Sequence, residues 1–400
     1  MRKRRIYLEQ KPLEEAKKLF FDALEKVGFF QAAEEEMDVR WALDRVTSRA
    51  IFAKRSSPHF RSSAMDGIAV RAKQTANARN DKPLKLKRGV DFEYIDTGQR
   101  IPEAFDAIIM IERVNAIDED TVEIREAVFP GKHVRQIGED FSMGEPVLPE
   151  NFKITPEAIA ALLNTGNLKI HVKRRPKCVY IPIGSELVPP DFELIGNQVP
   201  ESNSQLFKGY IEKWGGVASV WPIVKDEVAL MKEALAQAVK EFDLIALGAG
   251  TSKGRDDLTA TVVTELGQIL VHGVAYHPGH PILLGLIEDK PIIGLPGYAV
   301  ACWLGLMQFI KPLFEKYFKV ALKEAIVKGV LAKTIHSILN AREFVRVRLE
   351  KTEQGYLVHP LPGGASRLSS LLRADGIVEV PEEREGLQKG EEVIVKLLSL

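Results

Sequence analysis

The pattern of apolar and polar residues changes character several times along the chain. Residues 13–29 carry apolar side chains at helical spacing with acidic residues early, and Gly28 stands where a helix would end. We expect a second helix over residues 39–53. Short β-like runs between Gly, Pro and Asp follow from about residue 57 and predict a β-rich module. Thr155 before Pro156 marks the start of a further helix.

Strand-like and helix-like segments then alternate between residues 174 and 318. Such alternation predicts a parallel sheet covered by helices, and ligands bind such sheets at the carboxyl ends of the strands. From about Val327, four β-like segments with turn residues between them predict a small barrel or sandwich. The expected fold class is therefore multidomain α/β, with a central parallel α/β sheet domain, a β-rich module and a C-terminal β-barrel-like domain.

Length, charge and cysteine content restrict the possible functions. A chain of 400 residues suggests two to four domains of about 100–200 residues each. The 55 basic and 55 acidic residues cancel, so we expect no nucleic-acid partner. Cys178 and Cys302 lack companions at metal-ligand spacing, which argues against a disulfide framework or a zinc site. No secretion signal or membrane-spanning apolar run is seen, so we expect a cytoplasmic protein.

The stretch "FDLIALGAGTSKGRDDLT", residues 242–259, combines a strand with a glycine-rich loop and two acids. Glycines let the backbone approach an anion closely, and a following helix offers unpaired N–H groups to phosphate. Adjacent acids would repel phosphate unless a divalent cation lies between them, which indicates magnesium-assisted phosphate chemistry. The alternative is a solvated loop in which an Asp caps the next helix. The candidates are Gly248, Gly250, Thr251, Ser252, Gly254 and Asp257.

Four other turns carry polar residues beside glycine or proline. Three of the stretches, "IGSEL", "GAGTSKGRDD" and "GLPG", each follow a predicted strand, so a parallel sheet would bring them to one edge and form a pocket. The residues of interest in the four turns are Glu186, Asn203 and Ser204, His277 and His280, and Pro296.

Taken together, these motifs resemble the MoeA/gephyrin family of molybdopterin molybdenumtransferases over nearly the full chain. "SSAMDGIAV", "DTGQRIPEAFDAIIMIE" and "IGEDFSMGEPVL" are similar to its N-terminal motifs, and the loops above follow in family order. The resemblance implies a helical connecting domain, a β-rich module, a molybdopterin-binding α/β domain and a C-terminal β domain. We expect these over residues 1–45 plus 143–175, 46–142, 176–322 and 323–400, respectively.

The resemblance also implies an activity and an assembly. The activity is insertion of molybdate or tungstate into adenylylated molybdopterin, with release of AMP and assistance from Mg²⁺. The assembly is a homodimer in which the "SAMDG" module of one subunit faces the α/β pocket of the other. A molybdopterin adenylyltransferase is a further possible partner.

The resemblance assigns roles residue by residue. Glu186, Asp226 and Asp257 are placed around magnesium and the pyrophosphate, while Ser252 and the glycine-rich backbone hold the pterin or its phosphate. Asp66 and Asp140 match acidic positions associated with family activity, and Asp66 approaches from the partner subunit's module.

The oxyanion is expected among the two histidines, the Pro296 turn, and an Arg and a Ser from the C-terminal domain. An arginine suits a multi-oxygen anion because its planar fork donates several hydrogen bonds. Arg342 and Ser366 are the nearest counterparts of the family residues, with Arg346 and Ser369 as competitors.

The chain departs from the family pattern where it would handle the oxyanion and metal. His277 and His280 replace the usual lysines, and Ser185 stands where the family often has Asp. An unperturbed histidine titrates near ~6.5, so oxyanion attraction is expected to depend on pH. The chain is then either a variant insertase, with tungstate as one possible preference, or a paralogue with altered chemistry.

Two other functions compete with insertion. One is adenylyl transfer to molybdopterin, because the α/β domain also resembles that of the adenylyltransferase. The other is a non-catalytic molybdopterin-binding scaffold, which loss of the key acids would favour. Asp66, Asp140, Asp226 and Asp257 are all present, so the sequence favours an enzyme.

Overall fold

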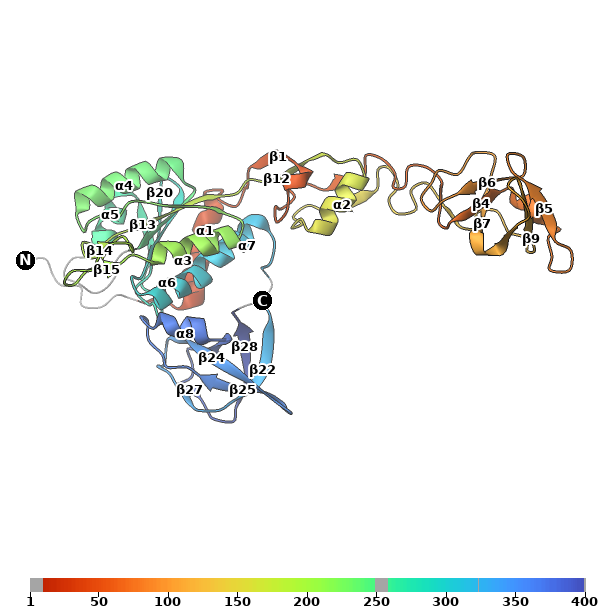
Figure 1. Ribbon diagram of the computed structural model, residues 1–400. Coiled ribbons are helices and arrows are strands. Elements are labelled where there is room, and N and C mark those ends of the chain that lie inside the picture. Colours follow the sequence, from red (N-terminus) through yellow and green to blue (C-terminus); the bar gives the residue numbers. More distant parts are fainter. Residues whose placement is uncertain (1–9, 249–257, 323, 399–400) are drawn as a thin grey trace, which may run out of the picture. The chain divides into compact units, whose positions relative to one another are not determined.

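The computed structural model describes residues 10–248, 258–322 and 324–398. The chain divides into two compact units, Met1–Ala33 with Lys173–Leu400, and Glu34–Val172. The four domain boundaries expected from the sequence remain a prediction. Figure 1 shows the elements of each unit, which are described separately below.

One part of the second unit is formed by the first and the last segments of that unit, which pack together. The helix predicted at Thr155 is confirmed, because the Thr155 side chain accepts a hydrogen bond from the Ala158 N–H at the start of α2. A core of apolar side chains, including Val39, Leu162 and Val172, joins these segments. The elements are β1 (Glu34–Asp38), η1 (Val39–Trp41), β2 (Ile51–Phe52), β11 (Pro146–Leu148), α2 (Pro156–Asn164) and β12 (Lys169–Lys173).

The helix expected over residues 39–53 is wrong. Only one 3-10 turn forms, at Val39–Trp41, and the Asp38 side chain caps it by accepting from the Arg40 N–H. Beyond it, Thr47 bridges to Val172 and its hydroxyl donates to the Pro149 carbonyl at 2.7 Å. In this segment, hydrogen bonds to distant segments therefore take the place of those that a local helix would form.

The rest of the second unit is the predicted β-rich module. Two three-stranded antiparallel sheets, with strand orders β6-β4-β7 and β5-β9-β8, pack around a core that includes Ile68, Phe92 and Val122. Its elements are β3 (Ser62–Ser63), β4 (Gly67–Val70), η2 (Ala72–Thr75), β5 (Leu84–Lys87), β6 (Phe92–Ile95), β7 (Ala107–Met110), η3 (Ile111–Arg113), β8 (Val114–Ala116), β9 (Thr121–Ile124) and β10 (Val134–Arg135).

The first unit contains a six-stranded sheet with the order β16-β13-β17-β21-β20-β18. Its first four strands are parallel, as predicted. The β21–β20 and β20–β18 pairings are antiparallel, so the sheet is mixed rather than wholly parallel. The strands are β13 (Lys177–Pro182), β16 (Val217–Val220), β17 (Leu244–Gly248), β18 (Gln268–His272), β20 (Leu283–Ile287) and β21 (Lys290–Leu295), with a separate pair β14 (Leu187–Val188) and β15 (Val199–Pro200).

Helices cover both faces of this sheet (Figure 1). α4 and α5 share one apolar core with the strands, including Leu235, Val262 and Ile245. On the other face α3 packs Phe207 against Tyr180 of β13, with ring centroids 5.5 Å apart. The remaining bounds are α1 (Leu13–Lys26), α3 (Asn203–Lys213), α4 (Val228–Glu241), α5 (Leu258–Leu266), α6 (Ala299–Gly305), the π-helical turn η4 (Leu306–Ile310) and α7 (Lys311–Phe318).

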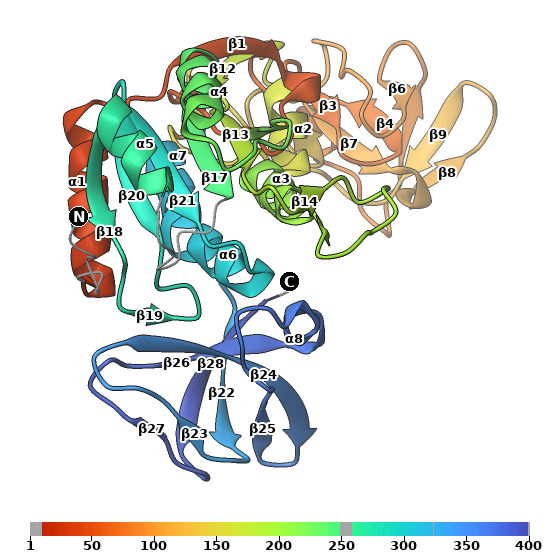
Figure 2. The ribbon, with the colours of Figure 1, turned by 90° about the vertical axis from the view of Figure 1, so that its left-hand side faces the viewer.

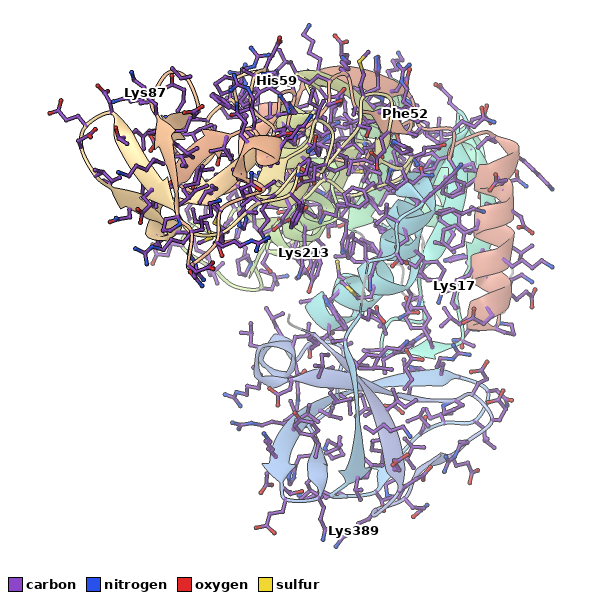
Figure 3. The ribbon with its side chains drawn as sticks, turned by 90° about the vertical axis from the view of Figure 1, so that its right-hand side faces the viewer. Lys17, Phe52, His59, Lys87, Lys213 and Lys389 are labelled. Carbon is purple, nitrogen blue, oxygen red and sulfur yellow. The ribbon has the colours of Figure 1, made fainter. Side chains whose placement is uncertain are left out.

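Helix α1 packs against the sheet domain although it comes from the start of the chain. Leu13, Phe20 and Leu24 are buried, and the helix ends just before Gly28, whose φ is +74°. Lys17, labelled in Figure 3, donates through Nζ to Gln308 Oε1 of η4 at 3.0 Å. Burial lowers the pKa of Lys17.

The C-terminal part of this unit forms the predicted barrel. Five strands pair in the order β24-β25-β22-β28-β26, and a further β24–β26 pairing closes the sheet on itself. A short strand from the sheet domain, β19 (Tyr276–His277), joins its edge beside β24 (Figure 2). The other elements are β22 (Ile326–Leu331), β23 (Ile335–His336), β24 (Arg342–Thr352), β25 (Gly355–Pro360), α8 (Leu368–Arg373), β26 (Gly376–Val380), β27 (Gly386–Leu387) and β28 (Glu392–Leu397).

Candidate functional site

Hydrogen bonds join two loops and the end of a third strand at the carboxyl edge of the parallel strands. The Ile183 N–H, after β13, donates to the carbonyl of Gly248 at the end of β17 at 2.9 Å. The Gly184 N–H donates to the Val224 carbonyl at 3.0 Å. These bonds place the loops that follow β13 and β16 side by side, with the end of β17 next to them.

Glu186 and Asp226 lie on these two adjoining loops. The Ser185 N–H donates to Asp226 Oδ2 at 2.8 Å, and the Asp226 N–H donates to Ser185 Oγ at 3.3 Å. Both acids are exposed. The structure therefore brings two of the three acids expected around magnesium onto neighbouring loops, with Ser185 orienting one of them. Gly250, Thr251, Ser252, Gly254 and Asp257 lie outside the described residues.

Gly248 has a steric reason to be glycine. A Cβ atom at this position would lie 1.9 Å from the Tyr180 hydroxyl oxygen on the neighbouring strand. Burial raises the pKa of the Tyr180 phenol well above its usual value, and the charge of Glu201 adds to this effect. The side chain of Asn203, at the start of α3, acts on the Tyr180 pKa in the opposite direction.

The side chains of Asn203 and Ser204 are engaged with the protein. Asn203 Nδ2 donates to the Gly297 carbonyl in the "GLPG" turn at 2.8 Å. The backbone N–H of Ser204 donates to Glu201 Oε1 at 2.9 Å, and its hydroxyl donates to Glu201 Oε2. Glu201 is buried, and its carboxylate caps the start of α3 by accepting from the Ser204 N–H. Both side chains are thus bound to other parts of the protein at the start of α3.

The first turn of α6 is a meeting point for three predicted site segments. The Pro296 turn leads into it and is bound by Asn203. A Cβ atom at Gly279, within the "HPGHP" turn, would lie 3.2 Å from the Ala301 carbonyl oxygen. The Val300 N–H donates to the carbonyl of Ala365, next to Ser366, at 3.0 Å. The turns that carry His277, Pro296 and Ser366 are thus neighbours.

The two histidines of the "HPGHP" turn face one another. Their ring centroids are 5.3 Å apart, and the planes are tilted by 54°. The turn starts from β19, where His277 pairs with Glu343 of the barrel. Two imidazoles therefore lie at the junction between the sheet domain and the barrel.

Arg342 and Arg346 make different contacts. Arg342 forms a two-pronged ion pair with Glu382, at 2.9 and 3.1 Å, and Nη1 also donates to Glu14 at 2.9 Å. Arg346 is buried and donates to the Gly364 carbonyl and to Ser370 Oγ, both at 3.2 Å. Burial lowers the pKa of Arg346. Arg346, and not Arg342, thus contacts the segment that carries Ser366 and Ser369.

In the second unit, Asp66 occupies the loop before β4. Its Oδ1 accepts hydrogen bonds from the Thr97 N–H at 2.6 Å and the Thr97 hydroxyl at 2.7 Å. These two bonds lower the pKa of Asp66, with the backbone bond contributing most. Both hydrogen bonds therefore favour the ionised form of the Asp66 carboxyl group.

Asp140 lies on a second loop of the same unit. Its backbone N–H donates to the Ser57 carbonyl at 3.0 Å, and its side chain is exposed. The segment before it is linked to the Asp66 loop, because Val134 of β10 pairs with Ser63 of β3. Both acids predicted for this module thus lie on connected segments.

Three residues with structural roles at the site are not found by sequence reasoning. Thr97 holds Asp66, Glu201 caps α3, and Tyr180 fills the space under Gly248. The "TG" that follows "FEYID" marked Thr97 only as part of a motif. Tyr180 lies inside an apolar run, where nothing in the pattern distinguishes its hydroxyl from an ordinary core tyrosine.

Metal-ligand and membrane signals are limited in the described part of the chain. Among residues 10–248, 258–322 and 324–398, no group of three or more His, Cys, Asp and Glu side chains is arranged to hold a metal ion. Within the same residues, no helix is both long and apolar enough to span a bilayer.

Three family models cover most of the chain. Residues 11–166 match the MoeA N-terminal region (domain I and II). Residues 180–316 match a probable molybdopterin binding domain. Residues 328–398 match the MoeA C-terminal region (domain IV).

Individual proteins resemble the chain over almost its whole length. A putative molybdopterin biosynthesis protein of Methanocaldococcus jannaschii is 33% identical, covering 97% of this chain and 98% of its own. The molybdopterin molybdenumtransferase of Haemophilus influenzae is 26% identical, covering 92% and 94%. The crystal structure of a molybdopterin biosynthesis MoeA protein from Pyrococcus horikosii has a TM-score of 0.82 at 31% identity, covering 98% of this chain and 100% of its own. The chain described here belongs to the MoeA family of molybdenum cofactor biosynthesis proteins.

Proposed function

We propose that this chain is a molybdopterin molybdenumtransferase, which inserts molybdenum or tungsten into adenylylated molybdopterin and releases AMP. The observation that carries the proposal is the joined pair of acidic loops, with Glu186 and Asp226, beside the glycine end of β17. This arrangement suits a pyrophosphate, whose charge must be offset while backbone groups approach it closely. Relatives that carry this activity in their names cover almost the whole chain.

The two carboxylates have the donor chemistry that a magnesium ion prefers. They are hard oxygen donors on adjoining loops, and Mg²⁺ commonly takes only one or two protein carboxylates together with substrate phosphates. When bound, Mg²⁺ would offset the charge that develops on the phosphate oxygens. The Ser185 N–H donates to the Asp226 carboxylate, and Ser185 Oγ accepts from the Asp226 N–H. Together these two bonds orient the carboxylate. Asp257 belongs to the same proposal but lies outside the described residues.

The oxyanion would bind near the first turn of α6. His277, His280 and Ser366 lie on segments that meet there. For the arginine we prefer Arg346 to Arg342, because Arg346 contacts Gly364 and Ser370 on either side of Ser366. A guanidinium has five N–H groups, and that of Arg346 donates three hydrogen bonds, to Ser370, Phe344 and Gly364. Two N–H groups are then left for an anion.

We further propose that the protein acts as a cytoplasmic homodimer, with Asp66 and Asp140 of one subunit completing the site of the other. In the second unit the side chains of Trp41 and Leu168 are 78% and 65% exposed, respectively. The two residues lie on adjoining segments, because the Val39 N–H donates to the Leu168 carbonyl. A second copy of the chain would remove this apolar surface from water. A molybdopterin adenylyltransferase could deliver the adenylylated substrate.

One assay tests the activity directly. Purified protein is mixed with adenylylated molybdopterin, MgCl₂ and either molybdate or tungstate, and AMP release and metal retention are followed. We expect AMP release that requires the oxyanion, with the metal retained on the pterin. Absence of AMP under every condition would refute the proposal, whereas formation of adenylylated pterin from ATP would favour the adenylyltransferase.

A further inference from the structure

A three-part junction connects the barrel to the rest of the first unit. The Arg342 N–H, at the start of β24, donates to the Ala275 carbonyl at 3.0 Å. The Ala275 N–H donates in turn to the Lys11 carbonyl at 2.8 Å, just before α1. Residues 273–277 therefore lie between the N-terminal segment and the barrel (Figure 2). Whatever fixes Arg342 also fixes the segment that leads into the "HPGHP" turn.

The side chain of Arg342 extends the same junction. Nε and Nη2 donate to the two oxygens of Glu382, which follows β26 of the barrel, at 2.9 and 3.1 Å. Nη1 donates to Glu14 Oε1 in the first turn of α1 at 2.9 Å. The side chains of Arg342 and Glu382 are 22% and 28% exposed, so this pair is partly shielded from water, whereas Glu14 is 62% exposed. The hydrogen bond with Glu382 raises the pKa of Arg342 and lowers that of Glu382.

Helix α1 is a firm anchor for this contact. Its face against the sheet domain buries Leu13 and Phe20, and Lys17 reaches Gln308 of the π-helical turn. A guanidinium suits the position because its planar fork can bind one carboxylate with two bonds and still reach another. Lysine would offer a point charge without the fork.

We propose that Arg342 is a positioning residue that joins the barrel to α1 through Glu382 and Glu14, and thereby fixes the "HPGHP" turn beside Ser366. An oxyanion bound by the Arg342 guanidinium would compete with two carboxylates that already hold it. The activity part of this inference rests on the proposed oxyanion site, whereas the structural part stands without it.

The experiment compares Arg342→Gln, Glu382→Gln and the double variant in the full-length protein. The matched control is Arg384→Gln. This substitution breaks another two-pronged ion pair, with Glu391, between two residues of the barrel domain. Two quantities are measured: hydrogen exchange at the amides of Ala275 and Arg342, and the KM and kcat of AMP release for molybdate.

For a positioning role, Arg342→Gln and Glu382→Gln should both accelerate exchange at these amides. Both should raise the KM for molybdate by about tenfold, with little change in kcat, since a slightly displaced binding group costs mainly affinity. The double variant should be no worse than Arg342→Gln alone, because Arg342→Gln already removes the pairs with both Glu382 and Glu14. Arg384→Gln should change neither quantity.

A direct oxyanion ligand gives a different pattern. Glu382→Gln would then leave the KM unchanged or lower it, since the guanidinium would be released for the anion, and exchange at Ala275 would not change in Arg342→Gln. Either result overturns the inference. Should Arg342→Gln fail to fold, Glu382→Gln and Glu14→Gln decide by the same measurements. Hydrogen exchange is measured without substrate. If the unmodified protein releases no AMP, the proposed function is refuted, but the exchange rates still test the junction.

Discussion

The carboxylate of Asp66 receives two hydrogen bonds from one residue, Thr97. Both bonds favour the charged form, so the folded-state pKa of Asp66 lies below its ordinary value of 3.8. A carboxyl group with a lowered folded pKa stabilises the folded chain above its unfolded pKa. That contribution is lost as the pH falls through the folded pKa.

Replacing Thr97 by Ala should raise the pKa of Asp66 toward its ordinary value. The substitution removes the hydroxyl donor but keeps the backbone N–H, which is the larger cause of the shift, so the pKa should move only part of the way. An NMR titration of the Asp66 carboxyl carbon measures this. Thr352→Ala on β24 is the control, and an unchanged Asp66 titration in Thr97→Ala would contradict the assignment.

Ser185 offers a second test at the scale of a single side chain. In Ser185→Ala the Asp226 N–H loses its acceptor, although the Ser185 N–H still holds Oδ2. Loss of a residue that orients a metal ligand weakens metal binding by roughly 10- to 100-fold, and the remaining bond places this variant near tenfold. The Mg²⁺ concentration for half-maximal AMP release is the measurement. Ser219→Ala on β16 should leave it unchanged, and equal values in both variants would remove Ser185 from the metal site.

At the scale of the elements, Gly248 ends strand β17 at the point where the sheet meets the candidate site. Its replacement by Ala would force a Cβ atom to 1.9 Å from the Tyr180 hydroxyl oxygen and 2.3 Å from the ring carbon that bears it. Since neither β13 nor β17 can move independently in a buried sheet, we expect a loss of about 1–3 kcal/mol in the free energy of unfolding. Chemical denaturation measures it.

The control for Gly248 is Gly209, in the middle of α3. A Cβ atom there would meet no heavy atom within 4 Å. Alanine at an open helical position should stabilise the chain by about 0.5–1 kcal/mol. Opposite signs for the two Gly→Ala variants are the expected outcome, and similar destabilisation by both would contradict the steric explanation.

Periodicity predicted the elements that are held by local interactions. α1, α2 and the βα alternation follow from apolar spacing and from Thr155 as a cap. It failed where distant pairing decides the structure. Residues 39–53 have helical spacing, yet Thr47 bonds to Pro149 and bridges to Val172. The antiparallel strands β18 and β20 were missed, although Glu288 and Asp289, both at positive φ, form the tight turn that joins β20 to β21.

The positions of the candidate site residues could be expected from the sequence only in part. Loops that follow parallel strands must share an edge, so the proximity of the Glu186 and Asp226 loops could be expected. The choice between Arg342 and Arg346 could not, because the two residues lie on one strand and differ only in their partners. Glu382, Glu14 and the 364–370 segment are far away in sequence, and only the fold brings them to these arginines.

For the whole molecule, the proposed homodimer leads to a test that needs no further structure. If Asp66 of one subunit completes a site that contains Glu186 of the other, Asp66→Asn and Glu186→Gln each inactivate both sites of their own homodimer. In a mixed dimer, one site receives both defects and the other receives neither. Subunits unfolded together and refolded at equal amounts should therefore recover about a quarter of the wild-type AMP release, since random pairing makes about half of the dimers mixed.

The control for this complementation is a mixture of Glu186→Gln and Asp226→Asn. These two acids lie on adjoining loops of the same subunit, joined through Ser185. Every site in that mixture keeps one defect, so no activity should return. Recovery in the first mixture and not in the second requires that the two units contribute to one site from different chains. Recovery in neither mixture, from dimers shown by light scattering to have exchanged subunits, would place Asp66 and Glu186 in the same chain's site and refute the shared arrangement.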